Sequence, residues 1–243
     1  MGNVTLVTGA GSGIGAATCA VLAARGDAVA CVDLDGESAE RTAAALDGSI
    51  ALAADVTDQA EVERAVSATA ERFGSINNIV TCAGIEIGGH ALDVEVDAFR
   101  QVVDVNLTGS FLTAQAAARN MRAAGHGGAI VLIGSLNSHV ALPSASAYCA
   151  SKGGVLMLGK SLALDLAPLG IRVNVIGPGV TDTPMSAGSL ADPERSAEFM
   201  AHIPLRRPAE PAEIARVAAF LTSDDSSYMT GAFVPVDGGW LAS

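Results

Sequence analysis

The sequence predicts an α/β protein built on one doubly wound, mainly parallel, seven-stranded sheet flanked by helices. Strand-like and helix-like segments alternate from end to end, and the strand-like segments are nearly continuous apolar runs. Strands have this composition when both of their faces are covered, as in parallel sheets. A length of 243 residues without a linker, repeat or low-complexity tract indicates a single domain, 1–243.

Seven apolar segments define the predicted sheet: 4–9, 28–33, 50–55, 78–84, 129–135, 171–179 and 232–239. Helical periodicity occupies 13–26, 37–48 and a segment that ends near Phe73. Right-handed β-α-β connections between such elements give a doubly wound sheet. The segment 181–200 is polar and rich in small residues, so we expect a mobile substrate loop there.

Composition excludes several classes of function. With 26 acidic and 14 basic residues, the net charge is −12, which repels phosphate backbones, so no nucleic acid is expected as a partner. No run of about 18 apolar residues occurs, so no membrane span is expected. The first residues enter a strand instead of a cleavable targeting segment, which indicates a cytoplasmic protein. The histidines and cysteines show no metal-ligand spacing, so we predict no metal.

A glycine-rich turn, TGAGSGIG at 8–15, follows the first predicted strand. Its glycines allow a sharp turn, a close approach of backbone N–H groups to a pyrophosphate, and tight packing of the next helix. The N-terminus of that helix then faces the anion with unpaired N–H groups. Because a strand precedes the turn and a helix follows it, the context favours a dinucleotide-binding loop.

Asp33, at the end of the second predicted strand, indicates which dinucleotide is bound. A carboxylate about 20 residues beyond the glycine loop accepts hydrogen bonds from the hydroxyls of an adenosine ribose. The same charge repels a 2′-phosphate, and neither the glycine loop nor residues 34–37 contain a cation. The predicted cofactor is therefore NAD.

Tyr148 and Lys152 form the candidate acid–base pair. Residues four apart lie on one face of a helix, which places the ammonium beside the phenol. A nearby ammonium favours phenolate and lowers a tyrosine pKa from its usual value of about 10. Ser135 ends an apolar strand, at the edge where open α/β sheets bind ligands. Its hydroxyl can hold a substrate oxygen while Tyr148 moves the proton.

Together these motifs resemble the short-chain dehydrogenase/reductase family in its common single-domain form, and the resemblance covers essentially the whole chain. The matching features are the cofactor loop at 8–15, an adenine-contacting pair at Asp55-Val56, a helix-kinking catalytic asparagine at Asn106, the Ser–Tyr–Lys set at Ser135, Tyr148 and Lys152, the PGxxxT segment at 178–183 and the C-terminal VDGG at 236–239.

The resemblance implies two sets of site residues. Those implied to bind the cofactor are Gly9, Ser12, Gly13, Ile14, Gly15, Asp33, Leu34, Asp55, Val56, Cys82, Ala83, Gly84, Tyr148, Lys152, Pro178, Gly179, Thr181 and Thr183. Those implied to be catalytic are Asn106, Ser135, Tyr148 and Lys152. One position departs from the family pattern. The family has an asparagine where this chain has Cys82, so a thiol replaces the amide that ties the sheet backbone together near the adenosine.

The resemblance also implies a reaction. As a phenolate, Tyr148 removes the proton of a secondary alcohol while hydride passes to the nicotinamide, and the reverse direction reduces a ketone. Ser135 positions the substrate oxygen, Lys152 lowers the Tyr148 pKa and holds the nicotinamide ribose, and Asn106 helps a water connect Lys152 to solvent. A 3-oxoacyl thioester reductase is an alternative, and an NAD-binding sensor without turnover is an alternative of a different class.

Three further polar residues are expected in the substrate pocket beside Ser135 and Tyr148. They are Glu86, Asn137 and His139, and they favour a small polar secondary alcohol or its ketone as the substrate. The resemblance also implies assembly, because family members usually form tetramers. Segments rich in small apolar residues at 113–121 and 153–164 are the expected contacts, so we predict a homotetramer.

Overall fold

The computed structural model describes residues 2–242 and contains the predicted sheet. Its strands are β1 (Val4–Thr8), β2 (Ala28–Asp33), β3 (Ser49–Ala53), β4 (Asn78–Thr81), β5 (Gly128–Ile133), β6 (Ile171–Pro178) and β7 (Phe233–Val236). Their order is β3-β2-β1-β4-β5-β6-β7, and all neighbouring pairs are parallel. The predicted fold class is confirmed. Residues 1 and 243 of the predicted domain range lie outside the described residues.

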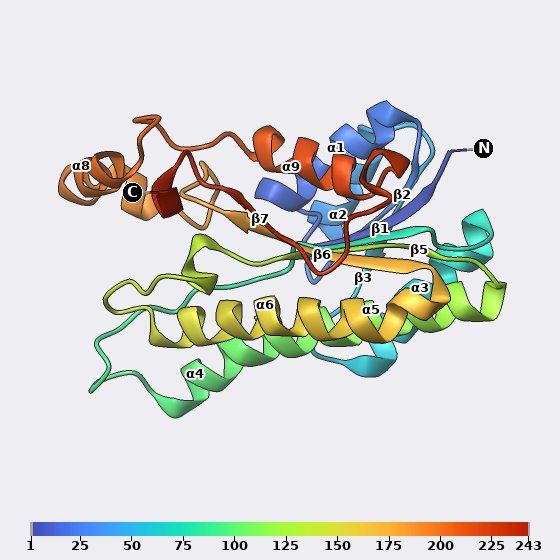
Figure 1. Ribbon diagram of the computed structural model, residues 1–243, viewed down its shortest axis with the longest axis horizontal. Coiled ribbons are helices and arrows are strands. Elements are labelled where there is room, and N and C mark those ends of the chain that lie inside the picture. The colour runs from blue at the N-terminus through green and yellow to red at the C-terminus, as the bar shows by residue number, and fades with distance from the viewer. Residues whose placement is uncertain (1, 243) are drawn as a thin grey trace.

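Helices cover both faces of this sheet (Figure 1). One face carries α1 (Gly13–Arg25), α2 (Gly36–Ala44) and α9 (Pro211–Leu221), and the other carries α3 (Gln59–Phe73), α4 (Val96–Val103), α5 (Gly109–Ala124) and α6 (Ser146–Leu166). Two short helices, α7 (Ala187–Ala191) and α8 (Pro193–His202), follow β6. None of the helices within residues 2–242 is both long and apolar enough to cross a membrane.

Burial on both faces explains the continuous apolar strands. In β1, Leu6 packs into the hydrophobic core on one side of the sheet and Val7 into the core on the other side. Both side chains are almost completely inaccessible, at 1% and 0% exposure. Consecutive residues of a strand point to opposite faces, so a strand between two cores carries apolar residues on both faces instead of on alternate positions only.

The segment 181–200 differs from the loop that we predicted, because most of it is helical. Asp192 caps α8 by accepting hydrogen bonds from the backbone N–H groups of Glu194 and Arg195, and Pro193 occupies the first helical position. An Asp-Pro pair at this place is a helix-start signal, since the carboxylate satisfies otherwise unpaired N–H groups.

The predicted helix 37–48 is also too long at its C-terminal end. Helix α2 ends at Ala44, and Gly48 adopts a left-handed conformation with φ of 72° just before β3 begins. Glycine takes this conformation without steric cost, so Gly48 turns the chain into β3 after the helix has ended.

Candidate active site

A cavity of about 680 Å³ lies where the carboxyl ends of β4, β5 and β6 meet the start of α6 and helix α8. Ser135, Tyr148 and Lys152 all line it, although they come from two separate parts of the chain. The order of the strands reverses between β1 and β4, and open α/β sheets bind ligands beside such a reversal. The structure thus brings the three predicted residues together at the predicted edge of the sheet.

Tyr148 and Lys152 lie one helical turn apart near the start of α6. The Lys152 ammonium is 5.6 Å from the centre of the Tyr148 ring and donates a 2.8 Å hydrogen bond to the carbonyl of Ile133, at the end of β5. Lys152 is 4% exposed. The predicted proximity of ammonium and phenol is confirmed, and the sheet itself holds the lysine in place.

The pKa values of this pair differ from our expectation. Burial raises the pKa of Tyr148 to about 12, an interaction with the Ser135 side chain opposes this rise, and the negative charge of Glu86 adds to it. Burial lowers the pKa of Lys152 to about 8. Loss of solvent therefore dominates both pKa values, because burial disfavours the charged form of both groups.

Replacing Lys152 by methionine is expected to stabilise the protein. Below a pH of about 8 the folded state carries a buried ammonium, whereas the unfolded lysine keeps its ordinary pKa of about 10.4, so the wild type loses up to about 3 kcal/mol at pH 7. Between about pH 8 and 10.4 the unfolded state binds more protons, so wild-type stability rises and the advantage of Lys152→Met shrinks. Urea unfolding at pH 7 and pH 10 measures both effects.

Lys160 provides the matched control for this experiment, since it is the chain's other lysine, lies on the same helix and is exposed. Lys160→Met should leave the free energy of unfolding within about 0.5 kcal/mol of wild type at both pH values. A Lys152→Met protein that is less stable than wild type at pH 7 would show that the hydrogen bond to Ile133 outweighs the cost of burying the charge.

Asn106 lies in a π-helical turn, Asp104–Thr108, which joins α4 to α5. Its buried amide accepts a 2.8 Å hydrogen bond from the Ile85 N–H and donates 3.0 Å hydrogen bonds to the Ile85 carbonyl and to the Ser151 hydroxyl. Ser151 in turn donates to the backbone carbonyl of Tyr148. The expected distortion of the helix is confirmed, and the amide links the loop after β4 to the helix that carries Tyr148.

The glycine loop has the shape that a pyrophosphate requires. Ser12 precedes the first turn of α1 and makes no side-chain capping hydrogen bond, so the side chain leaves the N-terminal N–H groups of α1 free for an anion. Gly9 has φ of 63°, and a Cβ there would lie 2.6 Å from the backbone N of Ala83. A Cβ on Gly13 would meet the Thr183 methyl group at 3.2 Å, so the segment after β6 lies against this loop.

Asp33 is bonded to the glycine loop. One carboxylate oxygen accepts a 2.8 Å hydrogen bond from the Gly11 N–H, and the other accepts a 3.0 Å bond from the Asp35 N–H. The next cation after Asp33 along the chain, Arg41, is exposed and lies 3.8 Å from the Asp35 carboxylate. This group of residues therefore presents negative charge and hydrogen-bond acceptors beside the glycine loop.

Thr8 ties the loop after β4 to β1, at the position where this chain lacks the family's asparagine. The Thr8 carbonyl accepts a 3.1 Å hydrogen bond from the Cys82 N–H, and its hydroxyl accepts a 3.3 Å bond from the Ala83 N–H. Burial raises the pKa of the Cys82 thiol to about 12, partly opposed by a hydrogen bond with Thr18. The thiol is neutral, and main-chain bonds to Thr8 supply the tie between the strands.

The other predicted cofactor residues fall into two groups. Ile14, Gly84, Pro178, Gly179, Thr181 and Thr183 line the cavity together with Cys82. Farther along the sheet edge, Leu34 is exposed, the Asp55 carboxylate accepts hydrogen bonds from Thr57, and Val56 is buried. These positions extend the site from the cavity toward β2 and β3.

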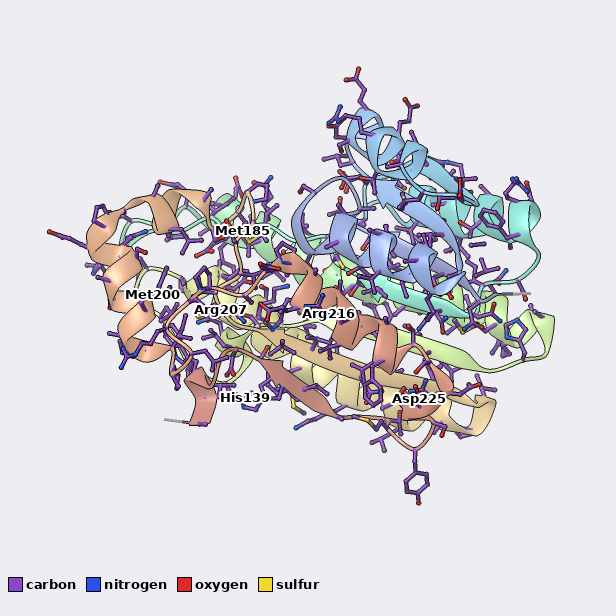
Figure 2. The ribbon with its side chains drawn as sticks, turned by 90° about the horizontal axis from the view of Figure 1, so that it is seen from above. His139, Met185, Met200, Arg207, Arg216 and Asp225 are labelled. Atoms are coloured by element: carbon purple, nitrogen blue, oxygen red, sulfur yellow. The ribbon has the colours of Figure 1, made fainter. Side chains whose placement is uncertain are left out.

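Of the predicted substrate residues, Glu86 and Asn137 line the cavity and His139 does not. His139 is exposed, and its ring packs edge-on against Phe233 of β7, with 4.4 Å between the ring centres. Figure 2 shows it well apart from Met185, which does line the cavity. The expectation for His139 is wrong because the short helix at 136–138 ends before it and turns its side chain toward β7.

Sequence analysis missed the wall that α8 and the C-terminal segment contribute. Arg195, Glu198, Phe199 and Trp240 line the cavity, and Trp240 also stacks on His202 with 5.0 Å between the ring centres. The Asp-Pro helix start was the available signal for α8. Nothing in the local sequence indicated that Trp240 packs against that helix.

Comparison with known proteins gives the family. The family model described as enoyl-(acyl carrier protein) reductase matches residues 9–241. The chain is 40% identical to 2-(R)-hydroxypropyl-CoM dehydrogenase of Xanthobacter autotrophicus over 100% of both chains. The crystal structure of a short-chain type dehydrogenase/reductase from Mycobacterium marinum is 35% identical, with a TM-score of 0.94, covering 100% of this chain and 96% of that one. The protein belongs to the short-chain dehydrogenase/reductase family.

A third relative, D-threitol dehydrogenase of Mycolicibacterium smegmatis, is 41% identical over 98% of this chain and 93% of its own length. Short-chain dehydrogenases/reductases use nicotinamide cofactors, and the loop geometry of this member fits such a cofactor. The protein is accordingly an oxidoreductase with a Rossmann fold.

Proposed function

We propose that this protein is an NAD-dependent dehydrogenase that interconverts a small polar secondary alcohol and its ketone. The observation that carries the proposal is the convergence of Ser135, Tyr148 and Lys152 in one cavity beside the glycine loop. Its relatives named for alcohol and polyol substrates support the reaction class.

Each residue of the set has a chemical task in this proposal. When bound, the nicotinamide accepts hydride from the substrate carbon or returns it. Tyr148 takes the hydroxyl proton in oxidation and gives it back in reduction. Ser135 donates a hydrogen bond to the substrate oxygen and stabilises the charge that develops on it. Lys152 supplies positive charge near the phenol. Asn106 holds the loop after β4 against helix α6 through its hydrogen bonds with Ile85 and Ser151.

The polar wall of the cavity supports a small hydrophilic substrate. Glu86 lies close enough to Tyr148 for its charge to raise the phenol pKa. A carboxylate in that position accepts a hydrogen bond from a second hydroxyl of a diol or polyol. Asp33 supports NAD as the cofactor, because its carboxylate lies next to the glycine loop and residues 34–37 contain no cation that could bind a 2′-phosphate.

Formation of NADH from NAD and a panel of alcohols tests the proposal. The panel contains 2-butanol, 1,2-propanediol, D-threitol, galactitol and 4-hydroxycyclohexanecarboxylate, and acetoacetyl-CoA with NADH tests the thioester alternative. We expect turnover with at least one alcohol and higher kcat/KM for polyols than for 2-butanol. Turnover of the thioester alone would replace the proposal, and tight NAD binding without any turnover would favour a sensor.

We also propose that the protein assembles into a tetramer. Of the two segments expected to form the contacts, only the one in α6 supports this proposal. The small residues Ala114, Ala116 and Ala117 of α5 are already buried within the chain, so they leave little apolar surface for a partner. By contrast, α6 exposes Met157 and Leu164, at 62% and 79%. An exposed apolar face of this kind favours self-association.

Light scattering at micromolar concentration should therefore give a mass several times that of one chain. The double substitution Met157→Glu, Leu164→Glu should shift it to smaller species, since charged groups oppose burial. Leu34→Glu, at a position that is 73% exposed just beyond the end of β2, should leave the mass unchanged. A stable wild-type monomer would contradict the proposal.

A further inference from the structure

The Ser135 hydroxyl is held by a neighbouring residue of its own turn. Ser135 precedes a short helix, Leu136–Ser138, and its Oγ accepts a 3.1 Å hydrogen bond from the Asn137 backbone N–H. Ser138 closes the turn by accepting a bond from the Ser135 N–H and donating to the Lys152 carbonyl at 2.8 Å. The turn that carries Ser135 is thus fastened to the helix that carries Tyr148 and Lys152.

The Asn137 side chain faces the same hydroxyl. Its Oδ1 lies 3.3 Å from the Ser135 Oγ, and its Nδ2 donates a 3.1 Å hydrogen bond to the Val140 carbonyl and lies 3.7 Å from the Cys149 sulfur. A carbonyl can only accept, so the Val140 contact fixes which end of the amide is nitrogen. The oxygen end must face Ser135, and Ser135 must be the donor in that contact.

This arrangement determines the state of Ser135 before substrate binds. Its one hydroxyl proton points to the Asn137 Oδ1, and one of its lone pairs is occupied by the Asn137 N–H. An O–H···O distance of 3.3 Å is longer than the usual 2.7–2.8 Å, so the bond to the amide is weak. A substrate oxygen with developing negative charge is a stronger acceptor and draws the proton away from the amide.

We propose that Asn137 is a positioning residue for catalysis: its side-chain oxygen holds the Ser135 hydroxyl in a single orientation from which the proton swings to the substrate oxygen. This inference rests on the proposed function. It assigns Asn137 a role that needs no direct contact with substrate, and it is consistent with the burial of both residues, which are 9% and 5% exposed.

A double-mutant cycle on kcat/KM tests the proposal, with the alcohol that gives the highest rate in the panel and saturating NAD. Asn137→Ala should lower kcat/KM about five- to tenfold in the wild-type background, the loss expected from one ordinary hydrogen bond. If Asn137 acts through Ser135, the same substitution should change kcat/KM less than about twofold in a Ser135→Ala background. Two reductions that simply multiply would overturn the proposal.

A second substitution keeps the test valid if the Asn137→Ala protein does not fold. Asn137→Asp keeps the size of the side chain and strengthens the acceptor, so it should hold the serine proton more tightly and lower kcat/KM only when Ser135 is present. If neither variant shows this dependence on Ser135, the proposal is wrong.

Asn174 provides the matched structural control. It is 1% exposed on β6, and its amide bonds the Met229 carbonyl and the Ala232 N–H, away from the cavity. Asn174→Ala should lower the Tm, and its effect on kcat/KM should be small and independent of Ser135. A Ser135→Ala enzyme with wild-type kcat/KM would instead contradict the proposed function, so the two failures are distinguishable.

Discussion

We expect the Tyr148→Phe enzyme to bind NAD almost as tightly as the wild type and to turn over at least a hundredfold more slowly. The substitution removes only the phenolic oxygen of a side chain that lines the cavity with Ser135 and Lys152. General acid–base groups typically contribute a factor of about 10²–10⁴. The measurements are kcat with the best alcohol of the panel and the Kd of NAD from fluorescence titration.

The chain's other tyrosine, Tyr228, makes this experiment well controlled. Tyr228 is fully exposed, so Tyr228→Phe should keep wild-type turnover. If Tyr148→Phe retained more than about a tenth of the rate, Tyr148 would not be the proton-transfer group.

The second large effect concerns the choice of coenzyme. NADP would bring its 2′-phosphate against the Asp33 carboxylate, which is held beside the glycine loop by the Gly11 N–H. Losing one or two charge-assisted hydrogen bonds and adding repulsion should cost about 3 kcal/mol or more, which corresponds to a preference for NAD on the order of a hundredfold. The ratio of kcat/KM for the two coenzymes at one substrate concentration measures this preference.

Substitutions at Asp33 test its part in that ratio. Asp33→Ala removes the carboxylate, and Asp33→Asn retains an oxygen that can accept from Gly11 while removing the charge. Both should erode the preference for NAD. Glu37→Gln removes a neighbouring exposed charge from α2 and should leave the ratio within about twofold. Equal values of kcat/KM for the two coenzymes in the wild type would show that Asp33 does not hold the ribose.

The fold was predictable because its determinants are local. A strand such as β1, whose alternate residues pack into two hydrophobic cores, is buried at every position and mostly apolar, and that pattern can be recognised in the sequence. The glycine loop could be recognised equally well from the sequence, since Gly9 and Gly13 adopt the positive φ that favours glycine. In both cases the structural requirement falls on consecutive residues.

The parts of the site that sequence analysis missed depend on contacts between distant residues. Trp240 lines the cavity because it packs against α8, and His139 lies outside the cavity because its ring packs against the ring of Phe233. The pKa of Tyr148 was expected to fall because of Lys152, but it rises because the surrounding chain removes solvent from the phenol. Burial depends on the whole fold, whereas the spacing of two residues on a helix does not.

The π turn at Asp104–Thr108 sets the rotational phase between the two helices that it joins. Because each α-helical residue corresponds to about 100° of rotation, one extra residue in a turn offsets everything beyond it by that angle. Helix α4 packs against α6, while α5 packs against α3 and β4. Deleting a single residue from this turn would therefore rotate α4 relative to α5 by about 100°, and it would carry the Asn106 amide away from Ile85 while leaving the composition of both helices intact.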